Sequence, residues 1–154
     1  MGLFDFLKRE THFFSPEEEQ RIMLAIEAAE KNTSGEIRLF VESHCEYMDP
    51  LRRAKELFAE LHMHETKLHN GVLVYIAMKD RQLAIFGDAG IHEKVGSSYW
   101  AEEVHKMIEA FKKQSYVDGI CGIVSDIGSA LSSNFPFDPN NDRNELSNEI
   151  VFGK

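Results

Sequence analysis

The pattern of apolar and polar positions predicts alternating helices and strands along the chain. The longest unbroken apolar run covers residues 72–78, which is typical of a strand buried on both faces. The polar break Lys79-Asp80-Arg81 has hairpin length and separates this strand from a second one over residues 82–86. Residues 36–42 alternate between apolar and polar side chains, so they predict an earlier strand.

Four helices are predicted from apolar stripes at helical spacing. The first begins at Ser15-Pro16-Glu17-Glu18, where a capping serine, a proline at the first helical position and a capping-box glutamate coincide. The second begins at Asp49-Pro50 by the same combination of cap and proline. The third begins at Ser97 or Ser98, and the last begins at Asp118-Gly119.

These elements follow in the order α-β-α-β-β-α-α, which predicts an α/β fold with a small mixed β-sheet and helices on both faces. The crossover between the strands at 36–42 and 72–78 should be right-handed, which makes these strands parallel, while the strand at 82–86 returns antiparallel. Residues 1–134 are expected to form a single domain. The sequence from 135 to 154 has no hydrophobic period, so an irregular C-terminal tail is expected there.

The composition is that of an ordinary soluble globular domain, with 154 residues, 43% hydrophobic and 28% charged. The net charge of −9 disfavours nucleic acid and anionic membrane surfaces as partners, and it is compatible with cations or basic partners. The two cysteines, Cys45 and Cys121, form no CxxC motif. This disfavours a zinc or redox site and favours a reducing, cytoplasmic location.

The N-terminal segment lacks the pattern of a signal peptide, and no apolar run reaches the length of a membrane span. We therefore expect a protein with neither a signal peptide nor a membrane anchor. A frayed or docked terminal turn is the favoured interpretation of residues 2–8. The alternative is a short amphipathic segment that contacts a membrane surface or a partner.

A lone carboxylate stands between two glycines in Gly87-Asp88-Ala89-Gly90, directly after a strand. Because the antiparallel strand runs back to the end of the sheet where the parallel strands start, we expect Asp88 to meet Glu36 and Asn70 there. Two carboxylates and an amide oxygen suit Ca²⁺ or Mg²⁺ better than zinc. The alternatives are that Asp88 only accepts backbone hydrogen bonds in its turn, and that Glu36 pairs with Arg38 or a neighbouring lysine on the surface.

A second candidate polar site lies at the opposite end, where open α/β sheets usually bind ligands. Its polar groups are Glu42, His44, Asp80 and Arg81. The histidines at 62, 64 and 69 lack the spacing of a zinc motif, so we expect a solvated helix end there. No organic cofactor is expected, because the sequence has no glycine-rich phosphate loop.

Five segments carry a resemblance to a known family, and their order and spacing extend it over nearly the whole chain. They are Ser15-Pro16-Glu17-Glu18, Thr33-Ser34-Gly35-Glu36-Ile37, Asn70-Gly71-Val72-Leu73, Gly87-Asp88-Ala89-Gly90-Ile91 and Asn144-Glu145-Leu146. With them the chain resembles the TPM-domain family, also called TPM phosphatases. The resemblance implies a Rossmann-like three-layer sandwich. It also implies a choice of roles, because the family includes a plant thylakoid-lumen acid phosphatase with calcium in an acidic pocket and an accessory protein of acetylcholine receptors.

Two functions therefore remain open. The favoured one is an accessory or protein-interaction module with an unidentified protein partner, steadied by a divalent cation such as calcium. The alternative is a weak metal-dependent acid phosphatase that hydrolyses phosphomonoesters with metal-activated water. The sequence has no GxSxG motif or phosphate cradle, which favours the first function. The expected convergence of Glu36, Asn70 and Asp88 favours the second.

Overall fold

The computed structural model describes residues 13–46, 49–139 and 149–153. The proposed contact segment 2–8 and the tail residues 140–148 lie outside these ranges. In chain order the elements are α2 (Pro16–Glu30), β1 (Glu36–Glu42), α3 (Pro50–Glu60), the short 3-10 helix η1 (Met63–Glu65), β2 (Gly71–Ala77), β3 (Gln82–Gly87), α4 (Ala89–Val95), α5 (Ser97–Lys112), α6 (Tyr116–Asn134) and β4 (Val151–Phe152).

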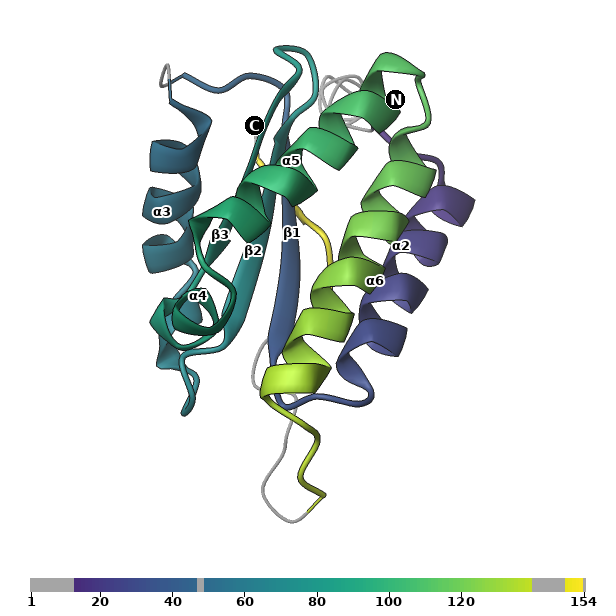
Figure 1. Ribbon diagram of the computed structural model, residues 1–154. Helices are drawn as coiled ribbons and strands as arrows, with labels where there is room; N and C mark the ends of the chain where they lie inside the picture. The colour runs from purple at the N-terminus through teal and green to yellow at the C-terminus, as the bar shows by residue number, and fades with distance from the viewer. Residues whose placement is uncertain (1–12, 47–48, 140–148, 154) are drawn as a thin grey trace, which may run out of the picture.

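The sheet forms the middle of three layers (Figure 1). Helix α3 covers one face, and α2, α5 and α6 cover the other. Every residue of β2 is buried, because this strand lies inside the sheet with helices over both faces. The predicted α/β sandwich with a small mixed sheet is therefore confirmed.

The strand order is β3-β2-β1-β4. Strands β1 and β2 are parallel, with Glu36 opposite Gly71, and β2 and β3 are antiparallel, with Val72 opposite Gly87. Both directions agree with the predicted right-handed crossover followed by a hairpin. As a result, the start of β1, the start of β2 and the end of β3 lie together at one end of the sheet.

A fourth strand, β4, was not predicted. It pairs in parallel with β1, placing Val151 opposite Phe40, and the Gly153 N–H donates to the carbonyl of Val41 (2.7 Å). Two residues are too few to show the alternating pattern of a strand in the sequence. This strand is defined only by its pairing with β1. The chain after α6 also contacts the turn before β1, where the Ser34 N–H donates to the carbonyl of Phe135 (3.0 Å).

The helices begin where their caps predict, with two exceptions. The capping box of α2 is formed in both directions, from Glu18 N–H to Ser15 Oγ (3.1 Å) and from Ser15 N–H to Glu18 Oε1 (2.8 Å). Helix α6 begins at Tyr116, two residues before the predicted Asp118-Gly119 start. The short helix α4 was not predicted as a separate element; Gly96, with φ of 81°, separates it from α5.

Candidate functional site

The backbones of Glu36, Asn70 and Asp88 lie next to one another at the strand-start end of the sheet. The Glu36 N–H donates to the carbonyl of Asn70 (3.3 Å), and the Asp88 N–H donates to the carbonyl of Gly71 (2.9 Å). This proximity follows from the strand directions alone. Whether the three side chains bind one cation stays a prediction.

The side chains of Asp88 and Asn70 have separate protein partners. Asp88 caps α4 by accepting the Ala89 N–H (2.8 Å), and its second oxygen lies 3.3 Å from Nδ1 of His69. The Asn70 amide nitrogen donates to Ser34 Oγ (3.2 Å). Its oxygen Oδ1 is buried and has no hydrogen-bond partner among the described residues. Buried polar atoms are nearly always paired. The unpaired Asn70 oxygen can therefore accept a further hydrogen bond or bind a cation at the strand-start end of the sheet.

The carboxyl group of Glu36 is hydrogen-bonded to that of Glu30 at the end of α2. The side chain of Glu36 is buried, and its hydrogen bond with Glu30 requires a proton on one of the two carboxyl groups. Glu30 Oε2 also accepts the Ile37 N–H (2.7 Å). Burial raises the pKa of Glu30 to about 7, against the opposing effect of these hydrogen bonds. The pair therefore holds a proton close to neutral pH.

A second buried carboxyl group, Glu103, lies between α5 and α6. Its residue is only 3% exposed, and Lys106 Nζ bridges it to Asp126 at 3.3 Å and 3.1 Å. Burial, followed by the hydrogen bond and negative charge of Asp126, raises the pKa of Glu103 to about 7. This buried carboxyl group was not predicted, because only the packing of α5 on α6 buries position 103.

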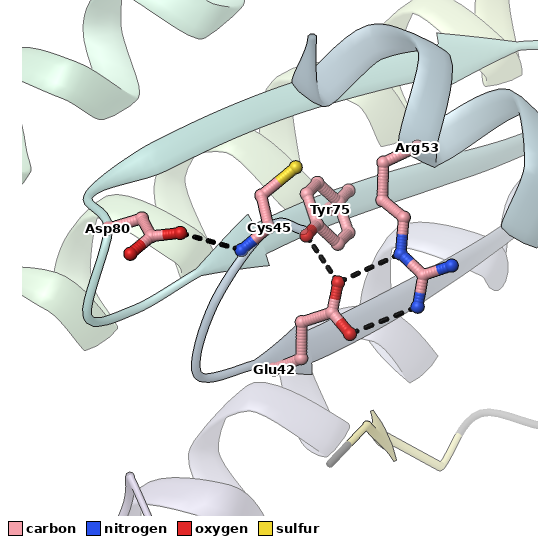
Figure 2. Close-up of polar contacts among 5 residues, drawn as sticks. All are labelled: Glu42, Cys45, Arg53, Tyr75 and Asp80. Carbon is pink, nitrogen blue, oxygen red and sulfur yellow. Dashed lines mark hydrogen bonds and ion pairs between the residues drawn. The ribbon is translucent and has the colours of Figure 1, made fainter. Parts of the chain in front are cut away.

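At the opposite end of the sheet, Glu42 is the centre of a buried ion pair (Figure 2). Arg53 of α3 binds both oxygens of Glu42, through Nε (2.9 Å) and an Nη atom (3.0 Å), and the Tyr75 hydroxyl donates to the same carboxylate. The hydrogen bond to Glu42 raises the pKa of Arg53, and burial raises that of Tyr75, so both remain protonated donors. The Tyr75 hydroxyl is also in hydrogen-bond contact with the Cys45 thiol.

Asp80 connects the two loops at this end. It accepts a hydrogen bond from the Cys45 N–H (2.7 Å), and its other oxygen lies 2.8 Å from Nδ1 of His44. The contact with His44 lowers the pKa of Asp80. Arg81 supplies a left-handed backbone conformation to the hairpin turn, with φ of 54°. Of the predicted second site, the structure thus brings His44 and Asp80 together, while Glu42 belongs to the adjacent ion pair.

Arg53 and Tyr75, which donate hydrogen bonds to Glu42, were not predicted as partners of this carboxylate. A buried glutamate at the end of a strand needs a counter-charge, and this need is the one available signal. It does not distinguish Arg53 from its neighbour Arg52, because the choice depends on how α3 crosses the sheet. Glu42 and Asp80 each accept hydrogen bonds from neighbouring segments, so they link β1 to α3 and the loop after β1 to the hairpin; we call this arrangement the structural clamp.

A groove with a volume of about 710 Å³ runs along β3 between α3 and α5. Its floor is β3, its α3 wall includes Leu51 and Lys55, and its α5 wall includes Ala101 and Val104. Asp88 lies at its α4 end. The groove is mostly apolar, and it was not predicted because it depends on two helices extending past the same edge of the sheet.

No helix within the described residues has the length and apolar character needed to cross a membrane. In those residues, no three His, Cys, Asp or Glu side chains gather closely enough to hold a metal ion.

Comparison with known proteins gives a consistent family. The family model described as the TPM domain, TPM phosphatase, matches residues 7–130. Among curated proteins, none matches the chain.

Solved structures share the fold. The BA42 protein of the psychrophilic bacterium Bizionia argentinensis is 39% identical, with a TM-score of 0.84 over 92% of this chain and 97% of that one. The N-terminal domain of the cg2496 protein from Corynebacterium glutamicum is 16% identical, with a TM-score of 0.62 over 79% of this chain and 76% of that one. The N-terminal domain of a P. gingivalis protein is 15% identical, with a TM-score of 0.67 over 82% and 81%.

Replacing Arg53 tests the structural clamp. Arg53→Met leaves Glu42 buried without its counter-charge, so we expect the free energy of unfolding to fall by about 3 kcal/mol. The matched control is Arg52→Met, because the Arg52 side chain is 74% exposed and makes a long ion pair, with Nε 3.9 Å from Oε1 of Glu56. That change should cost less than about 0.5 kcal/mol. Urea unfolding of both variants measures the difference, and equal losses would contradict the assignment.

The Glu30–Glu36 pair predicts a dependence of stability on pH. The pKa of Glu30 is raised in the folded state, so its protonation stabilises the fold. This contribution to the free energy of unfolding is fully present below about pH 4.5 and is lost as the pH rises through about 7. Glu30→Gln keeps the acceptor for Ile37 but does not ionise. Between pH 5 and pH 8 the free energy of unfolding should therefore fall by about 1–2 kcal/mol less in Glu30→Gln than in the wild type.

The control for this experiment is Glu17→Gln, an exposed glutamate on the same helix that does not contribute to the raised pKa of Glu30. Urea unfolding across the pH range should give the same slope for this variant as for the wild type. An unchanged slope in Glu30→Gln would show that the pair does not hold the proton.

Proposed function

The chain belongs to the TPM-domain family, and from this premise we propose that it is an accessory or protein-interaction module that holds a partner in the groove between α3 and α5. The observation that supports this function is the groove itself, an apolar cavity of about 710 Å³ open to solvent along the sheet edge. Concave apolar surfaces of this size are the usual form of binding sites in proteins.

Both walls of the groove expose apolar side chains to water. Leu51 on α3 is 41% exposed, and Ala101 on α5 is exposed beside the half-buried Val104. Ile108, one helical step beyond Val104, is 37% exposed. Apolar residues grouped in this way on a soluble domain favour a partner that removes them from water.

A divalent cation is a second proposal, supported by the unpaired Asn70 oxygen. We propose that Ca²⁺ or Mg²⁺ binds Asn70 Oδ1 together with Asp88 and Glu36. The donor set fits such an ion, since it consists only of carboxylate and amide oxygens. A carboxylate has several lone pairs, so Asp88 can cap α4 and bind an ion together. Glu36 would exchange the proton that it shares with Glu30 for the cation.

The enzymatic alternative uses the same place. A weak metal-dependent acid phosphatase would need a cation here to activate a water molecule for attack on a phosphomonoester. No observation on this chain favours that reaction over binding, so the interaction function is the conclusion.

Photo-crosslinking tests the groove as a docking site. A photoreactive phenylalanine analogue at Ala101 should give discrete protein adducts in the cells that make the chain, and one at Leu24 should not. Leu24 is the matched control, an exposed apolar residue on α2 outside the groove. Adding Leu51→Arg should reduce the Ala101 adducts at least about tenfold, which corresponds to about 1.4 kcal/mol of affinity. The same adducts from both positions would count against the proposal.

Thermal unfolding tests the cation. Calcium at about 100 times its dissociation constant should add about 2.7 kcal/mol of stability, a rise in Tm of about 5–10 °C over the EDTA-treated protein. Asp88→Asn keeps a good helix cap but loses the charge, so it should lose most of this shift. Asp80→Asn, at the opposite end of the sheet, should keep it. A shift that survives in Asp88→Asn would rule out this site.

The same samples decide between the two functions of the cation. Hydrolysis of p-nitrophenyl phosphate that needs the metal and disappears in Asp88→Asn would favour the phosphatase. A thermal shift without turnover would leave a structural cation.

A further inference from the structure

The floor of the groove offers no open strand edge to a partner. Strand β3 is almost fully covered there, with Leu83 7%, Ala84 4% and Ile85 3% exposed. A Cβ added to Gly87 would lie 2.3 Å from the Trp100 ring, so α5 packs directly against the end of this strand. An extended segment needs an open edge to form its backbone hydrogen bonds. The groove therefore suits an occupant whose backbone groups are already bonded internally, as they are in a helix.

The exposed parts of the groove are two helix faces, from α3 and α5, on opposite sides of the sheet (Figure 1). On α5, Ala101, Val104 and Ile108 recur at intervals of three and four residues, so they form one apolar stripe. On α3, Leu51 and Lys55 lie one helical turn apart. The side chains of a third helix laid between α3 and α5 would pack between these residues as ridges into grooves.

The α3 wall carries a positive charge that has no counter-charge. Lys55 Nζ lies 5.9 Å from the centre of the Phe86 ring. Within the part of the chain that the structure describes, no carboxylate forms an ion pair with it. An acidic side chain of a docked helix would meet Lys55 at the border of the apolar surface, where water is partly excluded. An ion pair there is stronger than one between fully exposed groups.

The net charge of the chain favours a partner that is basic overall. The formal net charge of −9 attracts a positively charged surface from a distance and speeds its association. The same charge repels a second copy of this chain over about a Debye length. A helix with one acidic side chain opposite Lys55 and an otherwise basic polar face therefore complements both the local contact and the overall field.

We infer that the groove binds an amphipathic helix of a partner protein, with an apolar stripe facing α5, one acidic side chain opposite Lys55 and an otherwise basic polar face. This inference rests on the proposed docking function of the groove. The apolar stripe from Ala101 to Ile108 covers about 10 Å of helix axis, at about 1.5 Å per residue. A partner helix of three to four turns is long enough to cover it and to reach Lys55.

Stapled helical peptides test the inference on the full chain, with fluorescence anisotropy as the measurement. Each probe has about 14 residues, or about four turns, with leucines on one face and lysines on the other. A single glutamate replaces each lysine beside the leucine stripe in turn. The reference peptide has its glutamate at the centre of the polar face and the same net charge. The best glutamate position should bind about fivefold more tightly than the reference, which corresponds to about 1 kcal/mol.

Three variants of the chain locate the bound peptide. Lys55→Glu should reverse the preference, so that the best peptide for the wild type binds more weakly than the reference. Ala101→Arg should weaken the binding of every peptide at least about tenfold, because it places a charge on the apolar wall. Ala101 is exposed, so the variant should unfold at the wild-type temperature. Leu24→Arg, outside the groove, is the matched control and should bind all peptides as the wild type does.

Three results would overturn the inference. The first is that no peptide binds more tightly than one of the same composition whose scrambled leucines form no single face. The second is binding that survives in Ala101→Arg, or a glutamate preference that Lys55→Glu leaves unchanged. The third is a dimer of the chain, seen by light scattering, that Ala101→Arg dissociates, because a second copy would then occupy the groove.

The crosslinks at Ala101 separate this inference from the docking function. Protein adducts at Ala101 without binding of any helical peptide would leave the groove as a docking site and remove the helix as its occupant. The absence of both adducts and peptide binding would remove the docking function as well.

Discussion

The parallel pairing of β1 with β2 is the constraint on which the rest of the structure depends. A parallel pair cannot be closed by a tight turn, so the chain must cross one face of the sheet, and α3 makes that crossing. The same crossing brings Arg53 over the end of β1, where it neutralises the buried Glu42. It also places one wall of the groove past the edge of β3. One pairing thus determines both the clamp at one end and the open surface at the side.

The main elements were predictable because their signals are local. The apolar run at 72–78, the alternation at 36–42 and the caps of α2 and α3 each identify an element without reference to the rest of the chain. Strand β4 was missed because its two residues become a strand only through the edge of β1. Helix α4 was missed because its cap, Asp88, also had a simpler interpretation as a turn residue.

The candidate sites were predictable only as far as the backbone topology defines them. Strand direction places Glu36, Asn70 and Asp88 at one end, and His44 and Asp80 at the other. Side-chain partners are a separate matter, because they depend on which way each helix presents its residues. For this reason the sequence did not predict the proton shared by Glu30 and Glu36. It also did not predict the contact of Arg53 with Glu42.

The exposed apolar walls of the groove give the protein's charge a second role. With a formal net charge of −9, molecules of this chain repel one another over about a Debye length, roughly 10 Å at moderate ionic strength. That repulsion opposes contact between the apolar walls of separate copies. Salt weakens the repulsion and leaves the apolar side chains unchanged. The colloidal behaviour of the protein is therefore tied to ionic strength.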